Sequence, residues 1–176
     1  MTTLQDMVAA ARQGMVYAQN DLALKYLYGE GLPQDSTKAL LWFRKAARQG
    51  DPIAQYNLGC MYSEGQGVER NITRALQWFT KAAEQGEHDA QNNLGVFYSR
   101  GIPDTDPPIA PNYELAIKWL TAAAEGGLPH AMYNLAYLYE HGKAGMNKAD
   151  EALQWFKMAA QLGHPQAQAR IESTNL

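Results

Sequence analysis

The chain has 176 residues, of which 46% are hydrophobic and 19% are charged, and its formal net charge is −3 at pH 7. This balance leaves no basic surplus to neutralise phosphates, which argues against nucleic acid as the main partner. No stretch approaches about 18 consecutive apolar residues, so we expect no membrane span.

The N-terminal residues and the cysteine usage favour a cytoplasmic location. The opening Met-Thr-Thr-Leu-Gln-Asp lacks the basic and apolar regions of a secretory signal. The single cysteine, Cys60, cannot form an internal disulfide, which fits a reducing compartment. A signal peptide trimmed from the N-terminus would instead allow a periplasmic location.

After a leading helix expected near residues 3–13, the sequence repeats itself with a period in the mid-thirties. Alanines recur at intervals of 36, 36, 41 and 36 residues, and glycines follow the same intervals: Ala18, Ala54, Ala90, Ala131 and Ala167; Gly14, Gly50, Gly86, Gly127 and Gly163. Such a period predicts a stack of supersecondary units, each burying its apolar face against its neighbours. We expect a single domain, 1–176, with repeats at 15–50, 51–86, 87–127 and 128–163 between capping helices in 1–14 and 164–176.

Each repeat contains two helical segments. In the second copy, residues 53–63 carry small or apolar side chains at a spacing of three and four: Ala54, Leu58, Gly59, Met61 and Tyr62. Residues 73–85 do the same with Ala75, Trp78, Phe79, Ala82 and Ala83. With the two caps, the chain should therefore form ten helices.

Capping residues mark the predicted helix boundaries. Asp35, Asn71 and Asn112 each precede a second helix, where a short acceptor side chain can bind free N–H groups. The fourth copy has Lys148 at this place and Asn147 one residue earlier. Prolines 52, 129 and 165 stand at favoured first positions of helices, and glycines 29, 65, 101 and 142 should end the first helices.

All four tryptophans fall within the repeat, as Trp-Phe or Trp-Leu followed by Ala-Ala: Trp42, Trp78, Trp119 and Trp155. A large ring beside small side chains lets neighbouring helices approach closely without leaving a void. We therefore expect the tryptophans to be buried in the core rather than to stack on a ligand, because a binding aromatic need not recur in every repeat.

The pattern resembles the Sel1-like repeat family, a relative of the tetratricopeptide repeat. The second copy carries the family residues Ala54, Leu58, Gly59, Tyr62, Gly65, Gly67, Ala75, Trp78, Ala82, Ala83 and Gly86. Ala23 and Ala136 replace the glycine that follows the leucine in two other copies. The resemblance covers about Gln13 to Ala169. It implies an all-α, right-handed superhelical solenoid of helix pairs.

The resemblance also implies a concave groove lined by the first helices, in which a protein or peptide segment would lie. Counting from the repeated alanines gives these groove positions: Tyr17, Asn20, Leu24, Tyr56, Cys60, Glu64, Asn92, Val96, Arg100, His130, Tyr133, Tyr137 and His141. The mixture of tyrosines and hydrogen-bonding side chains is typical of adaptable recognition surfaces. The alternative for each tyrosine is that it packs against the next unit.

The third repeat is five residues longer than the others and contains the proline-rich segment 102–112. Prolines stiffen such a loop, and loops that interrupt a regular repeat often carry specificity. A tolerated surface insertion is the alternative interpretation.

Catalytic and metal-binding motifs are absent from the sequence. The four histidines are scattered over different repeats, and no Cys-x-x-Cys or His-Glu-x-x-His spacing is present. Cys60 stands where other copies have Leu24, Val96 and Tyr137, which favours a packing or lining role over a nucleophilic one. We therefore expect no enzymatic activity, no cofactor and no metal.

The sequence thus predicts a non-enzymatic adaptor or scaffold that binds a protein or peptide segment. The alternative is a bacterial immunity protein that inhibits a cognate toxin or enzyme by occluding it. The residues do not identify the partner, the pathway or the oligomeric state.

Overall fold

The computed structural model describes residues 3–143 and 148–174, and this part of the chain folds into ten α-helices and no β-strand. The prediction of ten helices is confirmed. Their bounds are α1 Leu4–Arg12, α2 Val16–Tyr28, α3 Ser36–Arg48, α4 Pro52–Glu64, α5 Ile72–Glu84, α6 His88–Arg100, α7 Tyr113–Glu125, α8 Pro129–Glu140, α9 Ala149–Gln161 and α10 Pro165–Thr174.

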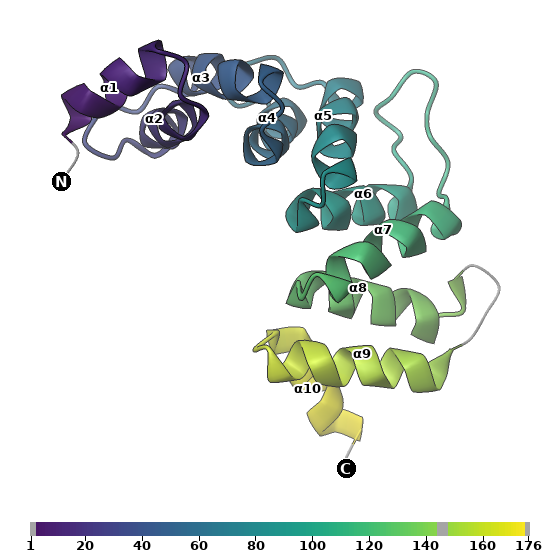
Figure 1. The fold of residues 1–176 in the computed structure, drawn as a ribbon. Helices are drawn as coiled ribbons and strands as arrows, with labels where there is room; N and C mark the ends of the chain where they lie inside the picture. The colour runs from purple at the N-terminus through teal and green to yellow at the C-terminus, as the bar shows by residue number, and fades with distance from the viewer. Residues whose placement is uncertain (1–2, 144–147, 175–176) are drawn as a thin grey trace. The chain divides into compact units, whose positions relative to one another are not determined.

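The helices form two compact units, Met1–Glu87 with α1 to α5 and His88–Leu176 with α6 to α10. Within each unit, every helix packs against the next one along the chain (Figure 1). The all-α solenoid of helix pairs predicted from the repeat is confirmed. Each unit has its own core of alanines, leucines and aromatic residues.

Helix α4 shows how local signals place a first helix. Asp51 caps its N-terminus by accepting a hydrogen bond from the backbone N–H of Ala54 at 2.7 Å, and Pro52 opens the first turn. The helix ends at Gly65, whose φ of +76° is a left-handed conformation that glycine adopts without strain. Its inner face buries Ala54 and Leu58 completely.

The predicted caps of the second helices are confirmed. The side-chain oxygens of Asp35, Asn71 and Asn112 accept backbone N–H bonds of 2.9, 2.8 and 2.9 Å at the starts of α3, α5 and α7. Lys148 precedes α9 without a side-chain cap, and Asn147 lies outside the described residues.

The expected burial of the tryptophans is wrong. All four are half-buried, whereas the residue after each one is almost fully buried: Phe43 at 0% exposed, Phe79 at 1%, Leu120 at 1% and Phe156 at 3%. The indoles of Trp42, Trp78 and Trp155 pack against the edges of the buried cores. Lysine ammonium groups stand 4.1 Å from the Trp42 ring centre and 4.7 Å from that of Trp78. The periodicity located the aromatic pair, but the second member of the pair fills the core.

Gly59 lets the buried phenylalanine of the second repeat approach the neighbouring helix closely, although the phenylalanine is equally buried where Ala23 and Ala136 replace this glycine. A methyl group at Gly59 would lie 2.5 Å from two carbons of the Phe79 ring, so the ring of α5 rests directly on the backbone of α4. In the third repeat, Gly95 leaves the same space for Leu120. A glycine in the first helix therefore allows the large core residue of the second helix to pack closely.

A set of glutamines joins successive helices and was not expected from the sequence. Side-chain amides of Gln19, Gln55 and Gln168 donate to the carbonyls of Ala11, Ala47 and Ala160 at 3.2, 3.3 and 3.2 Å. These carbonyls lie near the C-terminal ends of α1, α3 and α9, where each also accepts the backbone N–H of the glycine three residues later, Gly14, Gly50 or Gly163. The bonds therefore fix α2, α4 and α10 to the ends of α1, α3 and α9.

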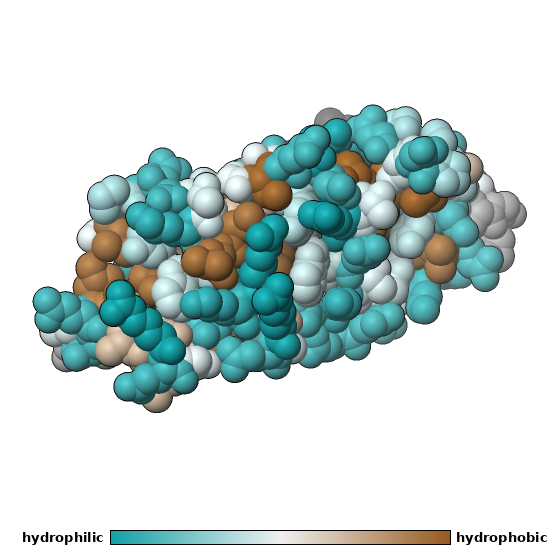
Figure 2. All heavy atoms as spheres, turned by 90° about the horizontal axis from the view of Figure 1, so that it is seen from above, coloured by the Kyte–Doolittle hydropathy of each residue, from teal (hydrophilic) through white to brown (hydrophobic). Residues whose placement is uncertain are grey.

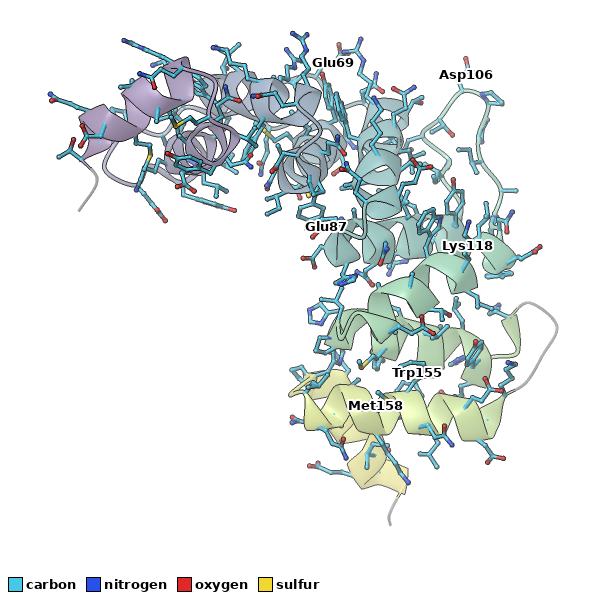
Figure 3. All side chains as sticks on the ribbon, viewed as in Figure 1. Glu69, Glu87, Asp106, Lys118, Trp155 and Met158 are labelled. Carbon is cyan, nitrogen blue, oxygen red and sulfur yellow. The ribbon has the colours of Figure 1, made fainter. Side chains whose placement is uncertain are left out.

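The loop between α6 and α7 extends away from the helices of its unit (Figure 1). At its base, Ile102 and Ile109 exchange two backbone hydrogen bonds of 2.7 and 2.9 Å, and Ile102 is 3% exposed. Thr105 donates within the loop to the carbonyl of Ile102 at 3.0 Å. The loop is thus anchored by a buried side chain, while Asp106 lies near its outer end (Figure 3).

Among the described residues, no helix combines the length and the apolar content that crossing a membrane requires. On the face drawn in Figure 2, hydrophobic residues form small groups among hydrophilic ones.

Candidate functional site

The predicted groove residues of α2 surround a shallow hollow in the first unit. Tyr17 is 66% exposed at its edge, Leu24 is half-buried, and Asn20 is buried at 8% exposed. The amide of Asn20 donates to Asp51 Oδ1 at 2.7 Å, which ties α2 to the capping residue of α4. Asn20 Oδ1 is buried with no hydrogen-bond partner among the described residues. Asn20 therefore has a structural role in addition to any contact with a ligand.

A more enclosed recess of about 400 Å³, the unit 1 recess, lies between α2, the start of α3 and α4. The predicted residues Tyr56, Cys60 and Glu64 line it together. Glu64 accepts a hydrogen bond of 2.8 Å from the Gln66 side chain, and the exposed Tyr28 stands beside them in the lining. The recess therefore has one carboxylate and no basic lining residue.

The second unit contains a recess of about 290 Å³, the unit 2 recess, between α6, α7 and α8. The predicted residues Val96, Arg100 and Tyr137 line it, and Lys143 adds a second cation. The ammonium group of Lys143 lies 5.6 Å from the centre of the Tyr113 ring. This recess carries two cations and no acidic lining residue.

The remaining predicted residues of α8 belong to an aromatic cluster around His164. The Tyr133 ring stacks on His164 with centroids 4.6 Å apart, and His130 meets His164 edge-on at 4.9 Å. Nδ1 of His164 accepts the backbone N–H of Ala167 at 3.3 Å, at the start of α10. Burial, and then the charge of His130, lower the pKa of His164, so the imidazole is held neutral as an acceptor.

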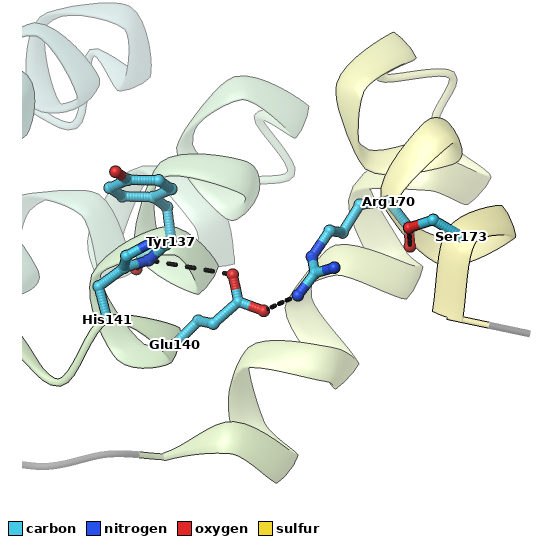
Figure 4. A network of polar contacts seen from close by, with 5 residues as sticks. All are labelled: Tyr137, Glu140, His141, Arg170 and Ser173. Atoms are coloured by element: carbon cyan, nitrogen blue, oxygen red, sulfur yellow. Dashed lines mark hydrogen bonds and ion pairs between the residues drawn. The ribbon is translucent and has the colours of Figure 1, made fainter.

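Next to this cluster, a polar network joins the end of α8 to α10 (Figure 4). Glu140 forms an ion pair with Arg170 and lies 3.9 Å from Nδ1 of His141. The His141 ring stacks on Tyr137 with centroids 3.9 Å apart. This stacking restrains the orientation of Tyr137 at the unit 2 recess.

Asn92, the last of the predicted groove residues, accepts a hydrogen bond of 3.0 Å from the Asn134 side chain. The equivalent tyrosines, Tyr56 and Tyr133, pack against Phe79 and Phe156 with centroids 5.9 and 5.4 Å apart. This row therefore combines packing within a unit with partial exposure.

Several lining residues were missed by sequence reasoning. Asn57 and Asn134 line the two recesses, and Gln66 and Lys143 stand at their turns. The asparagines had a detectable signal, because Asn57, Asn93 and Asn134 stand at the same position of three repeats. The turn residues Gln66 and Lys143 had no such sequence signal, since their position in a recess depends on how neighbouring repeats stack.

The sites offer shape, aromatic area and charge for recognition. Among the described residues, no group of three or more histidine, cysteine, aspartate or glutamate side chains is placed to hold a metal ion. Cys60 is half-buried in the lining of the unit 1 recess.

Helix pairs in tandem, with variable side chains over a constant framework, define a helical-repeat protein. The Sel1 repeat model matches residues 16–51, 52–87, 88–128 and 129–164, each one residue later than the bounds predicted from the sequence. The chain belongs to the Sel1 repeat family. Proteins of this family generally mediate protein–protein interactions.

Solved structures support this assignment. A protective antigen of uropathogenic Escherichia coli with an SLR fold is 35% identical, with a TM-score of 0.86 over 94% of this chain and 34% of that chain. A Sel1 repeat protein from Oxalobacter formigenes is 34% identical, with a TM-score of 0.80 over 88% and 61%. An immunity protein from Pseudomonas aeruginosa is 25% identical, with a TM-score of 0.59 over 93% and 58%.

The chain thus spans less than two thirds of the length of each of these three proteins. Comparison with the curated proteins gave no match.

Proposed function

We propose that the chain is a non-enzymatic adaptor or scaffold that binds a protein or peptide segment along its first helices. The observation that carries this proposal is the pair of recesses, one in each unit, lined mostly by residues that differ between repeats. Beneath them, the positions that recur, such as Ala54 and Leu58, are completely buried. The buried residues that hold the helices together are therefore different from the recess-lining residues that a partner would contact.

The recesses are preformed, which favours binding. Their walls are helices held by caps and by buried alanines, and in the first unit also by the glutamine bonds to preceding helices. A partner would therefore order few groups of this protein on binding, so less of the interaction energy is lost to conformational entropy. The exposed rings of Tyr28 and Tyr137 supply contact area at low entropic cost.

The test begins with affinity capture and mass spectrometry to identify a partner, followed by titration of the purified partner. Replacing both Tyr28 and Tyr137 by alanine should weaken binding by about thirtyfold, because interface tyrosines often contribute about 1 kcal/mol or more each. These two side chains are 66% and 45% exposed, so helix content by circular dichroism should not change. Tyr56 and Tyr133 are less suitable, because they pack on buried phenylalanines.

Met158→Ala is the matched control. Met158 is 43% exposed on α9, a second helix, and does not line either recess (Figure 3). Its variant should bind as the unaltered protein does. Equal losses in the control and in the double tyrosine variant would contradict the assignment of the binding surface.

The second candidate function is inhibition of a cognate toxin or enzyme, as by an immunity protein. It is favoured by the similarity to the Pseudomonas aeruginosa immunity protein over 93% of this chain. A tight one-to-one complex that abolishes the partner enzyme's activity would support inhibition. Binding of several partners without loss of their activity would support the scaffold.

A further inference from the structure

The two recesses occupy the same place in the repeat. Each lies where two consecutive first helices meet the start of the second helix between them. Their lining residues correspond two repeats apart: Tyr28 with Arg100, Asn57 with Asn134, and Gln66 with Lys143. The recesses are therefore two versions of one structural site, and their differences are informative.

The main difference between the two recesses is charge. At the positions of the neutral Tyr28 and Gln66, the unit 2 recess has the cations Arg100 and Lys143. The acidic Glu64 of unit 1 corresponds to His141, whose ring stacks on Tyr137. The unit 1 recess thus carries one negative charge, and the unit 2 recess carries two positive ones.

The positive recess lies in the acidic half of the chain. Residues 88–176 contain nine aspartates and glutamates but six lysines and arginines. Two of the other cations, Lys148 and Arg170, pair with glutamates, whereas Lys118 and Lys143 lie 5.0 and 5.6 Å from an aromatic ring centre. Among the described residues, no acidic side chain forms an ion pair with Arg100 or Lys143.

The apolar floor of the recess strengthens the attraction of these two cations for an anion. Leu120 and Leu138 are 1% and 5% exposed, so low-polarity side chains lie beneath the two cations. Charges beside a low-dielectric wall are less screened than charges on an open surface. An anion that entered the recess would therefore interact more strongly there than at an isolated lysine.

We propose that the unit 2 recess binds the side-chain carboxylate of an aspartate or glutamate in the partner's peptide segment. The planar guanidinium of Arg100 can hold a carboxylate through two parallel hydrogen bonds, and Lys143 adds a point charge. A recess of about 290 Å³ suits one or two side chains rather than a folded domain. This inference rests on the proposed function, and it names the partner chemistry that the second unit selects.

The experiment selects peptides from a displayed library of random dodecamers on the immobilised full chain. Selected peptides are then synthesised, labelled and titrated by fluorescence polarisation. We expect enrichment of aspartate or glutamate at one position. Its replacement by asparagine or glutamine should weaken binding on the order of tenfold, as expected for two partly screened charge contacts.

The protein variant Arg100→Glu with Lys143→Glu should weaken binding of the selected peptide by more than this factor, because two attractive contacts become repulsive. In this variant, replacing the peptide carboxylate by its amide should strengthen binding instead of weakening it, because the two groups contact each other and the introduced glutamates repel the carboxylate. Lys118→Glu with Lys157→Glu is the matched control, since it changes net charge equally at two exposed cations outside the recess. It should change affinity less than twofold.

Several results would overturn the inference. Selected peptides without acidic preference would do so, as would unchanged affinity in the Arg100 and Lys143 double variant while circular dichroism shows it folded. Binding could also be lost when the peptide C-terminus is amidated but be independent of the acidic side chains. The recess would then bind a terminal carboxylate, and the proposal would be rejected. Selection of no peptide at all would count against the proposed function itself, which distinguishes the two failures.

Discussion

Phe79 and Trp78 provide a sharp test of how the repeats are held together. Phe79 is 1% exposed and its ring rests on Gly59, so replacement by alanine should leave a cavity beside the backbone of α4. Such truncations cost about 3–5 kcal/mol. The half-buried Trp78 loses less packing, and we expect Trp78→Ala to cost about 1–2 kcal/mol.

Thermal and urea denaturation followed by circular dichroism would measure both variants. For a chain of this size, the Phe79 variant should melt roughly 10 °C lower, and the Trp78 variant a few degrees lower. Coincident transitions at several wavelengths would establish whether one free energy of unfolding describes both units. A Trp78 variant that loses as much stability as the Phe79 variant would place the indole in the core and refute this packing.

Substitutions at His164 and Asn71 would test the residues that cap the N-termini of α10 and α5. Burial lowers the pKa of His164 in the folded state, so the unfolded chain takes up the proton at a higher pH than the folded chain does. The contribution of His164 to the free energy of unfolding should therefore be complete above pH 6.5 and should fall as the pH drops towards the folded pKa. His164→Asn should keep a cap without this titration, and an unchanged pH profile in urea melts would exclude His164 as its source. Asn71→Ala should cost about 1 kcal/mol at the start of α5, whereas Asn71→Asp should retain the cap; equal denaturation midpoints for the two variants would contradict this.

Local signals were sufficient for the helices. Asn71 and Asn112 cap where the sequence predicts, because an acceptor side chain needs only the N–H groups of its own first turn. Gly65 ends α4 for an equally local reason. Such features require no knowledge of the neighbouring repeats.

Part of the candidate site also followed from counting along the repeat. Arg100 and Tyr137 were placed in one groove from the sequence, and the structure brings them into one recess. Lys143 was not foreseen, because a turn residue joins the recess only through the stacking of α8 on α7. The burial of Asn20 was missed for a similar reason, since it depends on Asp51 in the next repeat.

The sequence by itself determined the period, the ten helices and the family, because each depends on spacing and on contacts within a few residues. The tertiary structure decided which residue of each Trp-Phe or Trp-Leu pair is buried, since periodicity places adjacent residues only about 100° apart on a helix. It also decided the opposite charges of the two recesses. Those charges come from residues far apart in the chain, such as Arg100 and Lys143, which meet only when neighbouring helices pack.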